Sequence, residues 1–484
     1  MESIKVKEFI IELNGNLING NYNDQIQGVS IDSRTVDKEE LFFAIPGDNF
    51  DGHDFVKEAL GAGAKGVVIE AQRAVDYEFL NDELVIGVAD TKQALQDLAK
   101  YYRSLFEIPI IGVTGSTGKT TTKDLIASVL ATELKILKTK GNYNNEFGLP
   151  LTLFRLDSSH QAAVVEMAMR GLGEIEQLAE IAQPELGVIT NIGLSHLECL
   201  GSLENIALAK SELVKALPKH GCAVLNGDDQ YLRRMAVQSE AEVFYYGYEV
   251  DNELQVKEVQ DLGMAGLEFV VEFAKEEFKL ELPLSGEYNV YNSLAAIGVA
   301  LQLGLSMDSI KKGLAKPKLT EMRGDIKELA AGITLINDAY NANPTSMRAG
   351  LQLLNSLAKE DGRSIAVLGD MLELGPVAEE AHRQLAEDIL ARKVDYLFTV
   401  GDLAALIAQE AKEIGLAADK VFRCSNNREI VTYLLQLLEA NDTILLKGSR
   451  GMSLEEVETS LLAKVDQELI PATENYKSVG EGLE

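Results

Sequence analysis

A glycine-rich stretch at residues 112–124, GVTGSTGKTTTKD, contains the residue types that bind phosphate groups. The standard phosphate-loop pattern G-x-x-x-x-G-K-[S/T] would place a glycine at position 113, where this chain has Val113. A shorter pattern, G-x-x-G-K-T, remains at residues 115–120. Its glycines let backbone N–H groups turn toward phosphate oxygens, and the helix that follows adds a positive dipole. Lys119 can contact the β- and γ-phosphates, and the Thr120 hydroxyl can ligate Mg²⁺.

The alternative to a nucleotide site is an ordinary strand–turn–helix connection. Such a connection would need neither the Gly-Lys-Thr sequence nor the run of three threonines from Thr120 to Thr122, because threonine is a poor helix former. The stretch therefore predicts a nucleoside triphosphate site.

Two side chains that follow buried strands could hold a magnesium ion near this loop. Glu166 ends an apolar run in the sequence VVEMAM, and His196 follows another in TNIGLSHLE. Each of these residues alone is more commonly a solvated side chain at a strand end. Since both follow buried strands after a phosphate loop in one predicted domain, together they favour a metal site.

Three further residues have both structural and functional interpretations. Asn289 and Asn292 lie three residues apart, on one face of a predicted helix, and could hydrogen-bond a nucleotide base. Helix capping and packing explain Asn289 equally well and Asn292 less well. Lys210, in ALAKSEL, would by itself indicate a surface lysine.

The composition argues against several classes of protein. A net charge of −31 disfavours nucleic acid or an anionic membrane as a partner, because both carry negative phosphate groups. No apolar run approaches the roughly 18 residues that span a bilayer, and the N-terminus has no signal-peptide pattern. The cysteines Cys199, Cys222 and Cys424 lie far apart, which argues against a zinc site or a disulfide framework. We expect a cytoplasmic protein without stable membrane insertion.

The chain is long enough for about three domains, and its pattern changes along its length. Residues 1–100 alternate short strands with turns and end in a predicted helix at about 92–105. Residues 101–316 alternate helices with buried strands, which predicts a parallel sheet covered on both faces. The predicted strands of this second segment lie within residues 108–115, 162–169, 186–193 and 222–229. A more β-rich excursion at 267–284 precedes an apolar-periodic helix at 285–304.

Residues 317–468 repeat the alternation of strands and helices. The predicted strands lie within residues 332–340, 364–371, 395–402 and 442–450. They alternate with helical segments such as 379–393, which indicates a second doubly wound α/β domain. Residues 469–484 show no apolar period, and we expect them to form a disordered tail.

The shortened loop resembles that of the Mur ligases and of their relatives, the folylpolyglutamate synthetases, which form amide bonds with ATP. The resemblance extends over about residues 1–465 and has motifs in all three segments. It implies three α/β domains: an N-terminal UDP-binding domain, a central ATPase-type domain with a parallel sheet and a phosphate loop, and a C-terminal Rossmann-like domain. We expect a monomer that uses ATP and Mg²⁺.

The resemblance implies specific roles for residues of the central segment. ATP would bind the phosphate loop and the family's asparagine motif, here Gly115, Ser116, Thr117, Gly118, Lys119, Thr120, Thr121, Asn289 and Asn292. The magnesium ligands would be Thr120, Glu166 and His196, with His196 at a second ion. The lysine at the place of Lys210 is carbamylated in several Mur ligases, which turns a cation into a carboxylate that helps to hold Mg²⁺. The sequence leaves open whether Lys210 is modified.

Motifs of the C-terminal segment distinguish members of the family. Arg323, in EMRGDIKEL, resembles an arginine that moves toward the γ-phosphate when the domains close. The stretch NDAYNANPTSMRAGL contains candidate nucleotide contacts, Asp338 and Tyr340, and candidate substrate contacts, Asn341 and Asn343. Together with MRGLGEI, LGDMLELG and LKGSRGM, it resembles the member of the family that adds D-alanyl-D-alanine to UDP-N-acetylmuramoyl-tripeptide.

The N-terminal segment fits the same resemblance. Residues 30–55 resemble the family's uridine-nucleotide-binding region, with Ser33 and Arg34 toward the UDP end, although a polar turn before a helix explains residues 51–54 equally well. The stretch KGNYNNEFGLPLTL of the central segment resembles the part that meets the muramoyl-peptide. Its candidate contacts are Asn144, Asn145 and Glu146.

The implied reaction has two steps and belongs to peptidoglycan precursor synthesis. The terminal carboxylate of the tripeptide attacks the γ-phosphate of ATP to give an acyl phosphate and ADP, and the amine of D-alanyl-D-alanine then displaces phosphate. Lys119, Arg323 and two Mg²⁺ ions would neutralise the charge that develops. His196 and Lys210 would complete the catalytic set.

Three alternatives remain at this point. A phosphate-loop module without enzymatic activity would explain neither a UDP-type domain nor the loop after Asp338. A folylpolyglutamate synthetase is disfavoured by the whole N-terminal UDP-type segment and by NDAYNANP. The diaminoacid-adding Mur ligase would have an Asp-Asn-Pro-Arg motif, which the sequence lacks. Whether residue three of the acceptor peptide is lysine or diaminopimelate stays open.

Overall fold

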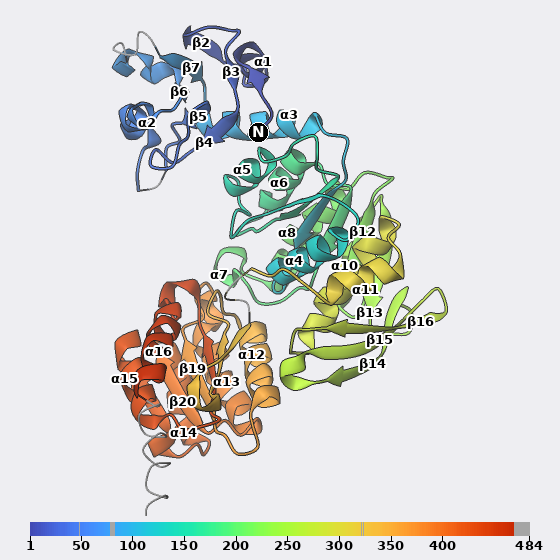
Figure 1. Cartoon of the computed structure of the whole chain (residues 1–484), viewed down its shortest axis with the longest axis vertical. Helices are drawn as coiled ribbons and strands as arrows, with labels where there is room; N and C mark the ends of the chain where they lie inside the picture. The colour runs from blue at the N-terminus through green and yellow to red at the C-terminus, as the bar shows by residue number, and fades with distance from the viewer. Residues whose placement is uncertain (48, 78–82, 321, 323, 469–484) are drawn as a thin grey trace, which may run out of the picture.

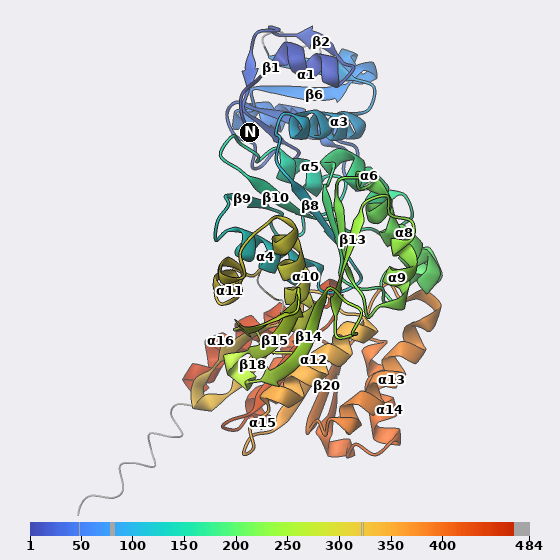
Figure 2. The ribbon, with the colours of Figure 1, turned by 90° about the vertical axis from the view of Figure 1, so that its right-hand side faces the viewer.

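Three α/β units follow one another along the long axis of the molecule (Figure 1). The structure is a computed structural model and describes residues 1–47, 49–77, 83–320, 322 and 324–468. In this part of the chain the strands form four sheets, which have two, five, nine and six strands. The N-terminal unit lies at one end and the C-terminal unit at the other, with the nine-stranded sheet between them (Figures 1 and 2). The predicted α/β class with three domains is confirmed, whereas the domain boundaries stay predictions.

The N-terminal unit contains the five-stranded sheet, in the order β2-β7-β6-β5-β4. All neighbouring pairs are parallel except β2 with β7. The strands are β1 (Ile4–Lys5), β2 (Asn16–Asn19), β3 (Gln25–Ile26), β4 (Gly28–Ser30), β5 (Glu40–Phe43), β6 (Gly66–Glu70) and β7 (Leu84–Val88). The helices are α1 (Val6–Glu12), α2 (Val56–Ala62) and α3 (Thr91–Ser104). Helix α3 begins where the Asp90 carboxylate accepts a hydrogen bond from Gln93 N.

The central unit is built on the nine-stranded sheet, in the order β16-β15-β14-β13-β12-β11-β8-β10-β9. Its strands are β8 (Ile110–Thr114), β9 (Ile136–Lys138), β10 (Ala162–Glu166), β11 (Leu186–Ile189), β12 (Cys222–Asn226), β13 (Glu242–Gly247), β14 (Leu254–Asp261), β15 (Leu267–Phe273) and β16 (Glu276–Leu282). All neighbouring pairs in the part of the sheet from β9 to β14 are parallel, and β8 lies between β10 and β11. The β-rich excursion is an antiparallel extension, β14-β15-β16, of the same sheet.

Helices cover both faces of the central sheet, and buried apolar side chains form a separate cluster on each face. The helices are α4 (Lys119–Leu130), α5 (Gly148–Leu153), α6 (Glu174–Ala182), α7 (Leu197–Leu200), α8 (Leu203–Ala216), α9 (Gln230–Ala236), α10 (Tyr288–Gln302) and α11 (Met307–Leu314). Strands β8, β10 and β11 are buried along their whole length, which explains their continuous apolar runs. None of the helices described has both the length and the apolar composition needed to cross a bilayer.

The C-terminal unit is a six-stranded sheet in the order β17-β18-β22-β19-β20-β21. Its strands are β17 (Asp325–Glu328), β18 (Thr334–Asn337), β19 (Ser364–Gly369), β20 (Tyr396–Val400), β21 (Val421–Cys424) and β22 (Thr443–Lys447). Helices α12 (Pro344–Leu357), α13 (Ala378–Ala391) and α14 (Ala404–Glu413) pack on one face, and α15 (Asn427–Leu437) and α16 (Glu455–Glu468) on the other. The predicted doubly wound arrangement is therefore present. The predicted tail, 469–484, lies outside the described residues.

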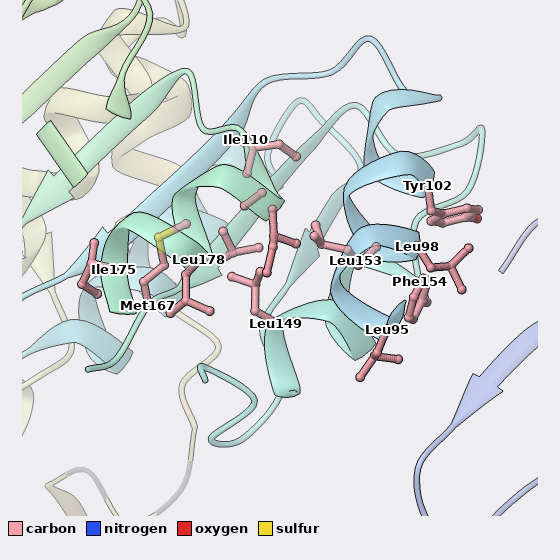
Figure 3. Packing of buried hydrophobic residues seen from close by; sticks show 14 of the residues in the cluster. Leu95, Leu98, Tyr102, Ile110, Leu149, Leu153, Phe154, Met167, Ile175 and Leu178 are labelled. Atoms are coloured by element: carbon pink, nitrogen blue, oxygen red, sulfur yellow. The ribbon is translucent and has the colours of Figure 1, made fainter. Parts of the chain in front are cut away.

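Helix α3 joins the N-terminal unit to the central unit through a shared apolar core. Figure 3 shows its side chains Leu95, Leu98 and Tyr102 beside Leu153 and Phe154 of the central unit. These residues belong to one buried cluster, which also contains residues from strands of the N-terminal and the central sheet. Apolar burial of this extent stabilises the junction without directional contacts, by about 25 cal/mol for each Å² removed from water.

The short segment that leads from the central unit to the C-terminal unit is held by hydrogen bonds instead of apolar packing. Asp124 on α4 is almost fully buried, and its carboxylate accepts hydrogen bonds from Thr320 N at 2.7 Å and Lys138 Nζ at 2.6 Å. Lys138 Nζ also donates to Lys318 O at 2.9 Å, and Lys318 N donates to Ser128 Oγ at 2.9 Å. Residues 318–320 are thereby fixed to the helix that starts at the phosphate loop.

Tyr102 gives a direct test of the α3 junction. Its hydroxyl donates to Leu156 O at 2.6 Å and accepts from Glu2 N at 2.8 Å, and its ring is buried. We expect Tyr102→Phe to lower the free energy of unfolding by about 1–2 kcal/mol, because both backbone partners lose a hydrogen bond. Urea denaturation followed by circular dichroism measures this. The control is Tyr22→Phe, at an exposed tyrosine, and equal stability of the two variants would contradict the assignment.

Candidate active site

The phosphate loop connects β8 to α4 and depends on two glycines with positive φ. Gly115 has φ +147° and Gly118 has φ +77°. A Cβ atom at Gly115 would overlap Thr190 Oγ1, and one at Gly118 would collide with Asn292 Oδ1. Only glycine therefore lets the backbone approach its neighbours this closely while turning its N–H groups toward the start of α4.

Side chains after β11 fix the loop from the opposite side. Thr190 Oγ1 donates to Thr117 O at 2.5 Å, and Asn191 Oδ1 accepts from Thr117 N at 3.1 Å. Ser116 Oγ donates to Gly193 O at 2.9 Å. The sequence reasoning missed the roles of Thr190 and Asn191. Their signal was the polar pair that directly follows the buried strand at 186–189.

Lys119 and Thr120 open helix α4, with Thr121 beside them in its first turn. Lys119 Nζ donates to Gly115 O at 2.7 Å, so the ammonium group lies over the glycine turn. Thr120 is 4% exposed. A lysine at this place can share its protons between the loop carbonyl and a phosphate oxygen without leaving the loop.

Glu166 lies at the end of β10, beside the strand that leads into the loop. In the register of the sheet it is opposite Val113. Its side chain is 1% exposed, and Oε1 accepts from Asn144 Nδ2 at 2.8 Å. Oε2 is buried without a hydrogen-bond partner among the residues that the structure describes. A buried carboxylate oxygen without a donor is costly, and a divalent cation would satisfy it.

His196 lies after β11 and reaches toward the C-terminal unit. Its Nδ1 is 2.6 Å from Glu373 Oε2, and its backbone has φ +54°. Burial and the nearby charge of Lys119 lower the pKa of His196, although Glu373 opposes this shift. The imidazole is therefore neutral at neutral pH, which is the form that binds a metal ion.

Lys210 is on α8 and is not a surface residue. Its side chain is 1% exposed. Burial, with a smaller contribution from the charge of Lys119, lowers the pKa of Lys210 well below its ordinary value. No acidic side chain forms an ion pair with it in the described part of the chain. The structure thus brings Lys119, His196 and Lys210 close enough to influence one another, and it favours the neutral amine of Lys210.

These residues fit a magnesium ion that is bound together with a nucleotide. Across residues 1–47, 49–77, 83–320, 322 and 324–468, no three His, Cys, Asp or Glu side chains gather as a complete metal site. Mg²⁺ usually takes one or two protein carboxylates and completes its octahedral shell with phosphate oxygens and water. Glu166 and the Thr120 hydroxyl match this requirement, and His196 supplies a neutral nitrogen.

The two asparagines of α10 contact the phosphate-loop helix. Asn292 Oδ1 accepts from Thr122 Oγ1 at 3.1 Å, and Asn292 Nδ2 donates to Asn289 Oδ1 at 2.9 Å. Asn289 Nδ2 donates to Ser285 O at 2.8 Å. Both side chains are 6% exposed. The amide of Asn292 thus links α10 to α4, the amide of Asn289 orients it, and contact with adenine stays a prediction.

Asp338 follows β18 at the carboxyl end of the C-terminal sheet. Its carboxylate forms an ion pair with Lys447, at the end of the neighbouring strand β22. Lys447 is 1% exposed and also donates to Asn341 O at 3.2 Å. The sequence reasoning did not select Lys447, although LKGSRGM contains it. A lysine that ends a buried strand next to a strand-end aspartate was the available signal.

In the loop after Asp338, one of the two candidate asparagines caps a helix and the other is exposed. Asn343 is the N-cap of α12: its Oδ1 accepts from Ser346 N at 2.8 Å, and Ser346 Oγ accepts from Asn343 N at 3.0 Å. Asn341 is exposed, and its Oδ1 accepts from Ala342 N at 2.9 Å. Tyr340 is partly buried. Substrate contact by Asn341 and Asn343 stays a prediction.

The remaining predicted contacts are spread over two units. Arg34 pairs with Asp32 through Nε at 2.9 Å and Nη2 at 2.7 Å, after β4, and Ser33 is buried beside them. This pairing raises the pKa of Arg34 and lowers that of Asp32 to about 2. Asn145 Oδ1 accepts from Gly148 N at 2.9 Å at the start of α5, and Glu146 lies 3.2 Å from Lys92 Nζ.

Three family descriptions match successive parts of the chain. They are "Mur ligase family, catalytic domain" at residues 25–103, "Mur ligase middle domain" at 113–300 and "Mur ligase, glutamate ligase domain" at 322–450. A Bacillus subtilis (strain 168) protein described as UDP-N-acetylmuramoyl-tripeptide–D-alanyl-D-alanine ligase is 39% identical over 458 residues, covering 94% of this chain and 98% of that relative. The chain belongs to the Mur ligase family.

The fold of this Mur ligase is similar to that of solved structures over nearly the whole length of the chain. A crystal structure of MurF from Acinetobacter baumannii has a TM-score of 0.87 at 30% identity and covers 96% of this chain and 100% of its own. MurF ligase from Thermotoga maritima, solved in complex with ADP, has a TM-score of 0.79 at 27% identity and covers 91% of this chain and 98% of its own. One predicted catalytic residue of this Mur ligase, Arg323, lies outside the described residues.

Gly115 gives a test of the phosphate loop. Alanine there would both overlap Thr190 and adopt a φ that side chains disfavour, at a cost of about 1–3 kcal/mol. We expect Gly115→Ala to weaken ADP binding by roughly ten- to a hundredfold, as measured by isothermal titration calorimetry. Gly61→Ala is the matched control, because a Cβ there would meet nothing within 4 Å. A folded Gly115→Ala protein that binds ADP normally would contradict the assignment.

Proposed function

We propose that this Mur ligase joins D-alanyl-D-alanine to UDP-N-acetylmuramoyl-tripeptide with ATP, releasing ADP and phosphate. The observation that carries the proposal is the near full-length similarity to a ligase of that description, at 39% identity. The phosphate loop and the buried Glu166 support it, because phosphoryl transfer from ATP needs groups that hold the phosphates and a carboxylate that can bind Mg²⁺. The reaction belongs to peptidoglycan precursor synthesis. We also propose that the protein is a cytoplasmic monomer.

The first chemical step brings two anions together. The tripeptide carboxylate attacks the γ-phosphorus of ATP, the bond from that phosphorus to the bridging oxygen of ADP breaks, and an acyl phosphate forms. Lys119 neutralises charge on the transferring phosphoryl group, and backbone N–H groups at the start of α4 hold the other phosphate oxygens. We propose that Arg323 adds a second positive charge. When bound, two Mg²⁺ ions would stabilise the same developing charge, with Thr120 and Glu166 as protein ligands of one and His196 as a ligand of the second.

The second step forms the amide bond. The amine of D-alanyl-D-alanine attacks the acyl carbon, phosphate leaves with the electron pair of the broken C–O bond, and the nitrogen loses a proton. Water must be kept from the acyl phosphate, because hydrolysis would waste ATP. We propose that Asp338, Tyr340, Asn341 and Asn343 at the carboxyl end of the C-terminal sheet face the nucleotide and the dipeptide, with Lys447 fixing Asp338.

We assign the remaining predicted residues to the UDP-linked substrate. Ser33 and Arg34 of the N-terminal unit would contact the UDP end, and Asn144, Asn145 and Glu146 would meet the muramoyl-peptide. Asn144 also donates to Glu166, so the peptide contact and the metal-binding carboxylate share one hydrogen bond. We propose the domain limits 1–100, 101–316 and 317–468 for these three roles.

Lys210 is suited to carbamylation. Its neutral amine can add to CO₂ with loss of one proton, which replaces a buried amine by an anion next to Lys119. Two oxygens would then be available to a magnesium ion. This modification places a negative charge near the ammonium group of Lys119 and adds a hard oxygen ligand of the kind that Mg²⁺ prefers.

The activity is tested by phosphate release from ATP with UDP-N-acetylmuramoyl-tripeptide, with and without D-alanyl-D-alanine. We expect sustained release only with both substrates and ATP. Lys119→Ala should lower the rate by about a hundredfold or more, because one charge that stabilises the transition state is lost. Release that needs a free diaminoacid and a dipeptide-bearing precursor would instead assign the sister enzyme. No release with either pair would contradict the proposal.

Carbamylation is tested by ¹³C NMR of the protein in ¹³C-bicarbonate. We expect one carbamate resonance that Lys210→Arg abolishes, because arginine does not form a carbamate. Loss of a metal-binding oxygen should lower activity by about tenfold or more. Lys215→Arg, at an exposed lysine on the same helix, is the control and should keep the resonance. The same resonance in Lys210→Arg would refute the assignment.

A further inference from the structure

Glu373 belongs to LGDMLELG, a motif of the C-terminal unit to which the reaction described above assigns no role. It follows β19 and reaches the central unit, where its Oε2 lies 2.6 Å from His196 Nδ1. The two residues are 177 positions apart in the chain. Figure 1 shows α7, the helix that begins after His196, at the junction between the central and C-terminal units.

Both residues have a backbone conformation that side chains seldom adopt. His196 has φ +54° and Glu373 has φ +62°. Such conformations persist where surrounding contacts enforce them, and they concentrate at functional sites. Here Glu198 N donates to Glu373 O at 3.2 Å, and a Cβ at Gly375 would lie 3.0 Å from Glu198 Cα. The backbones of the two units therefore meet closely around this side-chain pair.

The contact determines which nitrogen of the imidazole carries the proton. A carboxylate only accepts hydrogen bonds, so the nitrogen that faces it, Nδ1, is the donor. In a neutral ring the proton on Nδ1 leaves the lone pair on Nε2. Carboxylates that orient metal-binding histidines in this way are a common feature of metal sites. The other oxygen of Glu373 lies 3.4 Å from Arg170, whose side chain is 74% exposed, and such a surface ion pair contributes little.

We propose that Glu373 is a positioning residue that fixes His196 as the Nδ1–H tautomer and thereby presents Nε2 to a magnesium ion. The carboxylate comes from the C-terminal unit and the imidazole from the central unit, so the ligand is fully oriented only while the two units are in contact at α7. Binding of Mg²⁺ and docking of the C-terminal unit then favour each other, since such coupling is reciprocal. This inference rests on the proposed function in that His196 holds Mg²⁺.

The tautomer can be measured without metal or substrate. The chain has only five histidines, so long-range ¹H–¹⁵N correlation spectra of the histidine side chains can be assigned with His196→Gln. We expect the nitrogen shifts of His196 in the full chain to correspond to a protonated Nδ1 and an unprotonated Nε2. Glu373→Ala should remove this preference, and Glu373→Gln, which keeps an oxygen acceptor, should retain part of it. The opposite tautomer in the wild-type chain would overturn the proposal.

The consequence for metal binding is measured separately. We expect Glu373→Ala to raise the Mg²⁺ concentration for half-maximal phosphate release by about ten- to a hundredfold, as for other residues that orient metal ligands. Mn²⁺ binding to the ADP-bound enzyme, followed by electron paramagnetic resonance, should weaken in parallel. Glu379→Ala, at an exposed glutamate of the same unit, is the control and should change neither quantity.

Two results separate this inference from the proposed metal site. If Glu373→Ala leaves the Mg²⁺ dependence unchanged while His196→Ala raises it, His196 is a ligand and the role of Glu373 is refuted. If His196→Ala also leaves the Mg²⁺ dependence unchanged, the metal role of His196 itself is wrong. Tighter Mn²⁺ binding in Glu373→Ala would mean that the contact withholds the ring from the metal, which would equally overturn the proposal.

Discussion

Repulsion between like charges is the constraint on which the active site of this Mur ligase depends. An anionic carboxylate must attack an anionic polyphosphate inside a protein with a net charge of −31. The structure answers this with positive charge concentrated at one place, where the glycine turn, the start of α4 and Lys119 meet. Burial, with a smaller contribution from the charge of Lys119, lowers the pKa of a second lysine, Lys210. The acidic surface is therefore compatible with nucleotide binding, because distant charges are screened by solvent and near ones are not.

The three units are joined by two different kinds of contact, and the difference suits the chemistry. The N-terminal unit is attached through helix α3 and a continuous apolar core, which favours a fixed arrangement. The C-terminal unit is attached through polar contacts at Asp124, Lys138 and the pair of His196 with Glu373. Hydrogen bonds of this kind contribute about 1 kcal/mol each when water can replace them. A unit attached in this way can move relative to the phosphate loop while the N-terminal unit keeps its position on the central unit.

The sequence predicted the features that depend on local residue order. Buried β-branched runs identified β8, β10, β11 and β12, and the glycine and threonine pattern identified the phosphate loop. Short strands such as β9 and β21 were missed, because three or four residues carry too little periodicity to stand out. Helix α12 begins at Pro344, a residue that favours the first position of a helix, and Asn343 before it is the N-cap.

Features that depend on folding could not be predicted in the same way. The contact between His196 and Glu373 joins residues that only the packing of two units brings together. The pairing of Asp338 with Lys447 needs β22 to insert beside β18, which the order of strands along the chain does not reveal. The burial of Lys210 is likewise invisible in ALAKSEL, where a lysine within a helix usually faces water.

The central claim is that the tripeptide carboxylate attacks the γ-phosphorus of ATP. Its most direct test uses UDP-N-acetylmuramoyl-tripeptide labelled with ¹⁸O in the terminal carboxylate, with ATP and D-alanyl-D-alanine. The account predicts that each turnover transfers one carboxylate oxygen to the released phosphate, which mass spectrometry detects as a shift of two mass units. Phosphate without the label, or label found in AMP, would contradict it.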